Sequence, residues 1–287
     1  MSRADRLALA GDLEREGYLA DDGLLTAIHL ARRLGLPLLL EGEPGVGKTD
    51  VAAVLARVLH REFIRLQCYE GLDASHALYE WDYPKQLLHL RLAEVEGRRT
   101  EGLFDDQFLL QRPLLRALRA EGGVVLLIDE IDRADSEFEA FLLEFLSDFQ
   151  VTIPEVGTVR AVVPPVVILT SNRTRELHDA LKRRCLYHWI PYPDADRERA
   201  IIRAKAPDLD ERSAARLIDA VNAVRDLAPV KRPGIAESIA WARGVQLLSD
   251  EGCDWFEAMR RSLGLLVKYE EDIVLVEAHR EEVFAGS

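Results

Sequence analysis

Length, composition and charge limit the classes of protein to which this chain can belong. Its 287 residues are 48% hydrophobic and 30% charged, a composition that is typical of a folded chain and excludes a disordered one. The 50 acidic residues exceed the 37 Lys and Arg by 13, which disfavours general binding to nucleic acid or to anionic lipid.

Cysteine spacing and the apolar runs indicate the compartment. The three cysteines form no CxxC pair, so neither a disulfide framework nor a structural zinc site is predicted. Charges recur every few residues near the N-terminus, and no apolar stretch reaches the roughly 18 residues that span a bilayer. We expect a cytoplasmic protein with no integral membrane segment.

Five short apolar runs alternate with helical segments before residue 193. Continuous apolar runs are typical of strands buried on both faces, and the helices between them predict an αβα sandwich around a parallel sheet. This α/β domain is expected over residues 1–193. The runs are Leu36–Leu40, Phe63–Cys68, Val124–Ile128, Val166–Thr170 and Leu186–Ile190.

The strongest motif follows the first run. Residues 42–49, Gly-Glu-Pro-Gly-Val-Gly-Lys-Thr, match GxxxxGK[ST] between an apolar run and a helix. In this pattern backbone N–H groups surround a phosphate, Lys48 reaches the β and γ phosphates, and Thr49 ligates Mg²⁺. An ordinary Gly-rich turn is the alternative, which the match at every fixed position disfavours. The predicted nucleotide-binding residues are Glu43, Pro44, Gly45, Val46, Gly47, Lys48, Thr49 and Asp50.

The second run leads into a longer segment at about 69–113. Its first part holds four aromatic residues, where the chain average of 7% gives about one. They either touch a client or partner, or pack a helix onto the sheet, and the sequence leaves both open. Cys68, at the end of the run, is expected to be buried rather than reactive. The four aromatics are Tyr69, Tyr79, Trp81 and Tyr83.

Polar side chains follow the third and fourth runs. Asp129 is predicted to hold Mg²⁺, and Glu130 to orient or deprotonate the attacking water. Asn172 is expected at the same edge of the sheet, bonded to the γ-phosphate or the water. In isolation, an acidic pair is more often a turn or helix cap, and Asn more often ends a strand. The loop at 42–49 reverses that preference.

Three further elements complete the α/β part. A helix with a Phe-rich face is predicted around 138–149, capped by Asp135 or Ser136, and a hairpin follows at about 151–163. Arg183 and Arg184 precede the last run. Either one is a candidate arginine finger acting in a neighbouring subunit, and the alternative is a basic helix C-terminus that the helix dipole favours.

The remainder of the chain, residues 194–287, shows helical periodicity throughout. We predict a small all-α lid domain there. One apolar stripe is formed by Leu217, Ile218, Val221 and Val224, and another by Trp255, Phe256, Met259 and Leu263.

Taken together, these motifs resemble those of AAA+ ATPases. The resemblance makes 42–49 the Walker A loop, Asp129 and Glu130 the Walker B pair, Asn172 the first sensor, and Arg183 or Arg184 the finger. The insert and the hairpin are similar to those of the MoxR group. Residues 65–73, 79–84 and 170–180 are similar to the CoxD-like branch, which is associated with maturation of carbon-monoxide dehydrogenase.

The resemblance implies an ATP-hydrolysing, Mg²⁺-dependent chaperone that acts on a molybdenum hydroxylase beside a protein with a von Willebrand factor A domain. It also implies a homo-oligomeric ring, for which six subunits are expected. One position departs from the MoxR pattern, because Gly234 stands where the second-sensor arginine is expected. Arg232 or Lys231 is the alternative contact to the nucleotide.

Two other functions compete with an ATP-driven chaperone. One is a nucleotide-dependent assembly switch or scaffold that needs little turnover. The other is a DNA-directed AAA+ machine, which the charge of −13 disfavours.

Overall fold

The computed structural model describes residues 3–95, 102–154 and 156–284, and the chain forms two compact units. The first consists of Met1–Leu9, Asp21–Glu41 and Thr49–Trp189. The second consists of Ala10–Ala20, Gly42–Lys48 and Ile190–Ser287. Helix α1 (Arg3–Arg15) contributes to both. The division expected at 193/194 stays a prediction.

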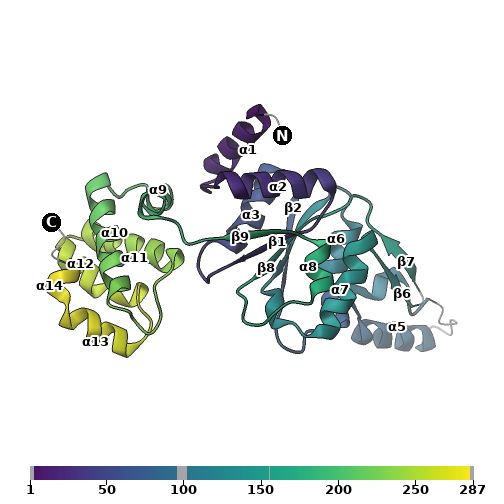
Figure 1. The fold of residues 1–287 in the computed structure, drawn as a ribbon. Coiled ribbons are helices and arrows are strands. Elements are labelled where there is room, and N and C mark those ends of the chain that lie inside the picture. Colours follow the sequence, from purple (N-terminus) through teal and green to yellow (C-terminus); the bar gives the residue numbers. More distant parts are fainter. Residues whose placement is uncertain (1–2, 96–101, 155, 285–287) are drawn as a thin grey trace. The chain divides into compact units, whose positions relative to one another are not determined.

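A five-stranded sheet with helices packed around it confirms the predicted α/β class (Figure 1). Its order is β2-β5-β8-β1-β9, and the pairs β2–β5, β5–β8 and β1–β8 are parallel. All six residues of β5 and all five of β1 are buried, as continuous apolar runs predict. The strands are β1 (Leu38–Gly42), β2 (Glu62–Gln67), β5 (Val124–Asp129), β8 (Val166–Ser171) and β9 (Leu186–Ile190).

The strand register brings the polar ends of neighbouring strands together. Gln67 on β2 lies opposite Asp129 on β5, and Glu41 on β1 lies opposite Ser171 on β8. Side chains that follow these strands therefore share one edge of the sheet, where ligands of open α/β sheets bind.

Alternate residues along the strands are buried against the flanking helices. One set, including Leu39, Ile64 and Leu126, joins a single core cluster with residues of α6 and α7. The alternating set on β1 and β8, including Leu38 and Ile168, is equally buried, whereas that of β2 is exposed. Both faces of the inner strands are thus covered, which requires helical layers on each side. The helices of this unit are α2 (Asp22–Leu34), α3 (Lys48–Val58), α6 (Pro113–Arg119), α7 (Ser136–Asp148) and α8 (Asp179–Arg184), and Asp135 caps α7.

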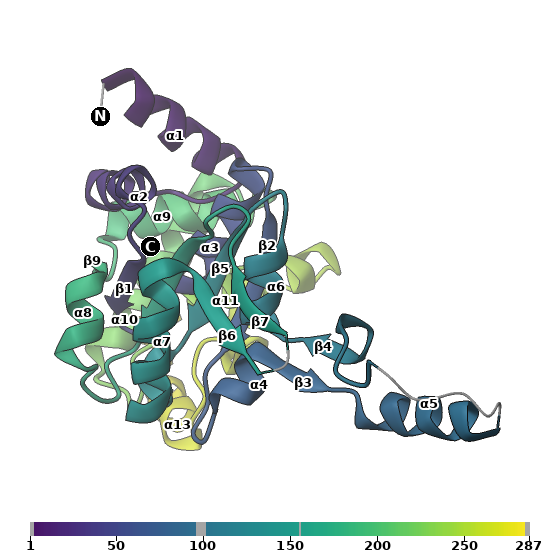
Figure 2. The ribbon, with the colours of Figure 1, turned by 90° about the vertical axis from the view of Figure 1, so that its right-hand side faces the viewer.

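The segment at 69–113 forms a small substructure, with residues 96–101 outside the described part. Trp81 is buried and meets Phe104 edge-on with ring centroids 5.2 Å apart, whereas Tyr69 and Tyr83 are exposed. Trp81 therefore packs in the core, whereas contact of the exposed Tyr69 and Tyr83 with a client or partner stays a prediction. Helix α5 extends away from the sheet (Figure 2). The elements are α4 (Ala74–Leu78), β3 (Tyr79–Trp81), α5 (Tyr83–Val95), η1 (Asp106–Phe108) and β4 (Leu109–Gln111), with β3 and β4 antiparallel.

The hairpin expected after the Phe-rich helix consists of β6 (Gln150–Ile153) and β7 (Gly157–Arg160). The two strands pair antiparallel, and Thr152 contacts Thr158 across the ladder with hydroxyl oxygens 3.1 Å apart. Residue 155 at the turn lies outside the described residues.

The second unit is a helical assembly with its own core. All four residues of the first predicted stripe are buried, and the Trp241 indole donates to the Met259 carbonyl at 3.0 Å. The second stripe is wrong at Phe256, which is 42% exposed and lies under the Arg216 guanidinium at 5.6 Å. The elements are α9 (Ala195–Lys205), α10 (Glu211–Asp226), α11 (Ile235–Asp250), α12 (Trp255–Arg261), η3 (Leu263–Leu265), α13 (Glu270–Ala278) and α14 (Arg280–Phe284). Within the described ranges, no helix combines the length and apolar character that a membrane crossing requires.

Candidate active site

The loop after β1 has the backbone that its glycines allow. Gly45 and Gly47 have φ values of +80° and +89°, a region that L side chains rarely adopt. A Cβ at Gly42 would lie 2.4 Å from the Ile190 carbonyl oxygen. Lys48 is buried, and its ammonium donates to the carbonyls of Gly42 at 2.7 Å and Glu43 at 2.8 Å. The loop thus curls around its own lysine.

Within the second unit, this loop lies against the start of α11. The Ala236 N–H donates to the Gly45 carbonyl at 3.2 Å. A Cβ on Gly234 would lie 3.1 Å from the Pro44 carbonyl and 2.9 Å from a carboxylate oxygen of Glu237, which accepts from the Gly234 N–H. A side chain at 234 would need the Glu237 carboxylate and the Pro44 carbonyl to shift slightly.

The alternative second-sensor residues, Lys231 and Arg232, are exposed in the second unit. The sequence did not single out Arg225, whose nearly buried side chain makes two hydrogen bonds to the Glu198 carboxylate at 2.6 and 2.9 Å.

Burial raises the pKa of Tyr192, and the Glu43 carboxylate raises it further. The phenol therefore stays protonated beside the loop.

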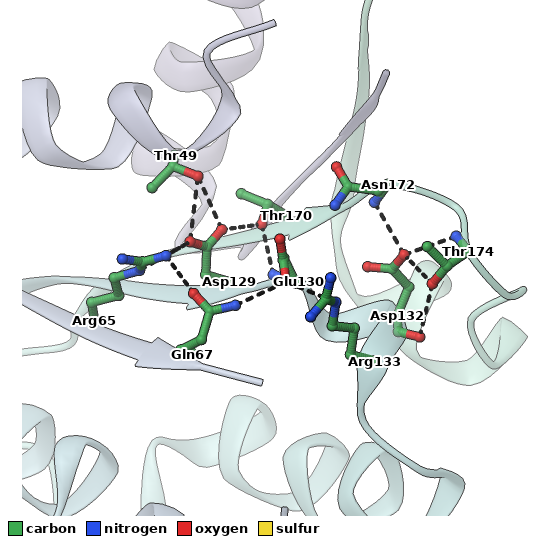
Figure 3. Close-up of polar contacts among 10 residues, drawn as sticks. All are labelled: Thr49, Arg65, Gln67, Asp129, Glu130, Asp132, Arg133, Thr170, Asn172 and Thr174. Carbon is green, nitrogen blue, oxygen red and sulfur yellow. Dashed lines mark hydrogen bonds and ion pairs between the residues drawn. The ribbon is translucent and has the colours of Figure 1, made fainter. Parts of the chain in front are cut away.

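In the first unit, Thr49 and Asp129 lie in direct contact (Figure 3). The Thr49 Oγ1 atom is 3.1 and 3.3 Å from the two carboxylate oxygens of Asp129. Thr170 on β8 donates to Asp129 Oδ1, and the Asp129 side chain is only 3% exposed. A hydroxyl and a carboxylate are hard oxygen ligands of the kind that Mg²⁺ takes, so the residues fit the predicted metal.

Glu130 is held in an uncommon backbone conformation. Its φ of +54° lies in the left-handed region, and its N–H donates to Thr170 Oγ1 at 2.9 Å. The carboxylate accepts from the Gln67 amide at 3.0 Å and pairs with Arg133 at 2.9 Å. Because of this turn, the side chains of Glu130 and Asp129 point in different directions, and the two carboxylates have different hydrogen-bond partners (Figure 3).

Asp132 organises the backbone around Asn172, a role that sequence reasoning missed. Its Oδ2 atom accepts from the N–H of Asn172 at 3.2 Å and from the N–H and hydroxyl of Thr174 at 2.8 and 2.7 Å. The other oxygen, Oδ1, is buried without a partner among the described residues. Asp132 therefore ties the turn after Glu130 to the end of β8.

Another residue without a local signal in the sequence is Arg65 on β2. Its guanidinium donates to Asp129 Oδ2 through Nε at 3.0 Å and Nη2 at 2.6 Å, and Nη2 also donates to Gln67. Arg65 and Gln67 stand two positions apart on an exposed strand face. Only the sheet order, with β2 next to β5, reveals that this face meets the acidic pair.

Cys68 is buried, as expected. Burial raises the pKa of its thiol to about 12, and the carboxylates of Asp129, Asp132 and Glu130 add to the shift. The thiol stays protonated at neutral pH, which argues against a nucleophilic or sulfur-transfer role. In the part of the chain that the structure describes, no group of three or more His, Cys, Asp or Glu side chains forms a metal cluster.

The two finger candidates lie at the C-terminal end of α8, where both are exposed. Arg184 donates to the Ser147 hydroxyl on α7. Arg183 makes no hydrogen bond or ion pair with any described residue, so its guanidinium is available to another molecule.

Comparisons with known proteins agree with this geometry. Residues 37–185 match the family model described as AAA domain (dynein-related subfamily). An uncharacterized protein of Staphylococcus epidermidis is 26% identical over 226 residues, which cover 76% of this chain and 78% of that protein. The denitrification regulatory protein NirQ of Pseudomonas aeruginosa is 26% identical over 253 residues, or 86% of this chain and 88% of NirQ.

Solved structures show the same fold. The RuvB Holliday junction branch migration motor of Thermotoga maritima superimposes with a TM-score of 0.50 at 16% identity. The match covers 94% of this chain and 76% of that one. At this identity the likeness concerns the fold alone.

Proposed function

Because the chain belongs to the dynein-related subfamily of AAA domains, we propose that it binds ATP with Mg²⁺ and hydrolyses it. The contact between Thr49 and Asp129 carries the proposal. It joins the last residue of the phosphate-loop motif to the first carboxylate of the acidic pair, which are 80 positions apart in the sequence.

Each residue then has one task. Lys48 and the loop N–H groups bind the phosphates, and Thr49 and Asp129 hold the metal. When bound, Mg²⁺ would offset the negative charge that develops on the phosphates during transfer. Glu130 orients the attacking water and takes its proton, and Asn172 hydrogen-bonds the γ-phosphate or the water.

Two variants test this assignment. Glu130→Gln removes the base but keeps the side-chain size, so we expect unchanged binding of a fluorescent ATP analogue and phosphate release slowed by about 10²–10⁴. Lys48→Ala is expected to abolish binding. Glu144→Gln, which changes an exposed carboxylate on α7, is the control and should match wild type. Hydrolysis at the wild-type rate in Glu130→Gln would refute the assigned base.

For the biological role, we propose a MoxR-type chaperone that uses hydrolysis to remodel a protein client, during cofactor maturation of a molybdenum hydroxylase such as carbon-monoxide dehydrogenase. The segments at 65–73, 79–84 and 170–180 support this branch. The relation to NirQ, a protein named for a role in denitrification, supports an accessory role in metabolism.

Trapping the chain with bound ATP tests which client it binds. Glu130→Gln chains held with ATP should co-purify with a molybdenum hydroxylase and with a von Willebrand factor A protein, and Lys48→Ala chains should not. Equal recovery with both variants would contradict an ATP-dependent client. A scaffold that needs no turnover predicts that Glu130→Gln supports maturation in cells, whereas the chaperone proposal predicts that maturation is lost.

A further inference from the structure

We propose that Arg65 is a positioning residue that competes with the divalent metal for the carboxylate of Asp129. The proposal rests on the proposed function, because it concerns the same metal site. It assigns Arg65 the task of holding Asp129 in place and of setting how much metal is needed to load the site.

The strand geometry fixes the contact. In the β2–β5 register, Arg65 lies opposite Leu127 and Gln67 lies opposite Asp129, so the Arg65 side chain extends along the strands to reach the carboxylate. Both of its bonds end on one oxygen, Oδ2, at 3.0 and 2.6 Å. The Arg65 side chain is 49% exposed, whereas the Asp129 side chain is 3% exposed. Arg65 can therefore move into solvent, and Asp129 cannot.

The two oxygens of Asp129 share Thr49 as a partner but differ in their other partner. Oδ1 accepts from Thr170, which is fully buried and also bonds the Glu130 backbone, so this oxygen is fixed by the fold. Thr49 lies 3.1 Å from Oδ1 and 3.3 Å from Oδ2, and Oδ2 also accepts from Arg65. A metal held by Thr49 and Asp129 would share the carboxylate with the Arg65 guanidinium, and two cations that use one carboxylate repel each other and compete for its lone pairs.

The contact also reaches the proposed base. Arg65 donates to the Gln67 side-chain carbonyl, and the amide of the same Gln67 donates to Glu130 Oε2 at 3.0 Å. Displacing Arg65 removes one partner of the side chain that holds Glu130. Metal loading and the setting of the Glu130 carboxylate are thus linked through two side chains of one strand.

The test measures the metal requirement in the full chain without turnover. A non-hydrolysable fluorescent ATP analogue is held at fixed concentration, Mn²⁺ is titrated, and free Mn²⁺ is counted by electron paramagnetic resonance. Arg65→Ala removes the competitor, and Arg65→Lys keeps the charge but loses the planar fork. The matched control is Arg116→Ala, which removes a half-exposed arginine that pairs at 2.6 Å with Glu62, at the other end of β2.

We expect Arg65→Ala to lower the half-saturating Mn²⁺ concentration about three- to tenfold, a modest factor because the Arg65 side chain is half exposed. Arg65→Lys should fall between this variant and wild type, and Arg116→Ala should equal wild type. Arg65→Ala should also lower the melting temperature without metal, and metal with nucleotide should restore most of the loss.

The results that would contradict the role of Arg65 differ from those that would contradict the proposed function. An unchanged or higher Mn²⁺ requirement in Arg65→Ala, beside normal binding by wild type, overturns the role of Arg65 and leaves the proposed function intact. If Arg65→Ala does not fold, a wild-type Mn²⁺ requirement in Arg65→Lys overturns it instead. A wild-type chain that binds no nucleotide in any metal overturns both proposals.

Discussion

A single hydroxyl, that of Thr170, joins the Asp129 carboxylate to the Glu130 backbone. It donates to Asp129 Oδ1 and accepts from the Glu130 N–H, and the residue is 1% exposed. Valine has the same shape but neither bond. We expect Thr170→Val to reduce the free energy of unfolding by about 1–3 kcal/mol and to slow hydrolysis.

Urea unfolding and phosphate release measure these two effects. The control is Thr152→Val on the hairpin, whose exposed hydroxyl contacts Thr158. If Thr170→Val matched that control in both assays, the hydroxyl would have no part in setting the acidic pair.

The raised pKa of Cys68 gives a prediction about pH. The folded chain holds the thiol proton more tightly than the unfolded chain does. This stabilising contribution is therefore complete below the ordinary thiol pKa of 9.0, and it is lost as pH rises towards about 12. At pH 8 we expect a thiol reagent to label Cys253, which is partly exposed, well before Cys68. Urea should equalise the rates, and equal labelling without urea would contradict the burial.

Sequence patterns identify the residues that follow a strand directly, and miss those that reach the site from a neighbouring strand. Asp129, Glu130 and Asn172 each end an apolar run, which is a local signal. Arg65 and Asp132 act on partners 64 and 40 positions away. Nothing in the sequence states that β5 lies between β2 and β8, so neither contact was predictable.

Among the elements, helix α5 carries apolar side chains that contribute little to the fold. Five of its large aliphatic residues are exposed, and Leu88 and Leu92 are 59% and 53% exposed. We expect the double change Leu88→Gln and Leu92→Gln to leave the melting temperature nearly unchanged. By contrast, Leu114→Ala in α6, where the side chain is fully buried, should cost about 2–5 kcal/mol.

Calorimetric unfolding of wild type, the α5 double variant and Leu114→Ala checks these two expectations about stability. A large loss of stability in the α5 variant would mean that these leucines are covered in solution. The loss expected for Leu114→Ala is the internal standard, because it removes atoms from the main core.

Whether a segment forms a strand or a helix is easier to predict from the sequence than what packs against it. The sequence patterns predict all five sheet strands, because each contains an apolar run of strand length, which can be recognised without knowing its neighbours. Phe256 fits a helical stripe by spacing, yet its stripe position faces solvent, and only the packing of α10 shows that Arg216 covers the ring. Periodicity predicts which residues share a helix face, but it does not predict what packs against that face.

At the scale of the whole molecule, the exposed arginines of α8 bear on assembly. We propose a homo-oligomeric ring in which Arg183 or Arg184 completes the site of a neighbouring subunit. Arg183 is the better candidate, because Arg184 already bonds Ser147. We expect Arg183→Ala to lose activity by about 10³-fold, and mixing with Glu130→Gln chains to restore part of it.

Restoration follows because a mixed ring contains some sites with both an intact finger and an intact base. Phosphate release as a function of the mixing ratio measures it, and each variant alone gives the baseline. A mixture no more active than the sum of its parts would argue against a finger acting between subunits.

The order of the sheet also has a consequence for synthesis on the ribosome. Leu39 of the inner strand β1 pairs with Leu169, 130 positions later in the chain. At roughly 5–20 residues per second, that partner emerges about 7–26 s after β1 does. Throughout this interval Leu38, Leu39 and Leu40, each at most 2% exposed in the finished fold, have no strand on either side. The nascent chain is therefore most prone to aggregate before its fourth sheet strand is made, and slower translation lengthens that period.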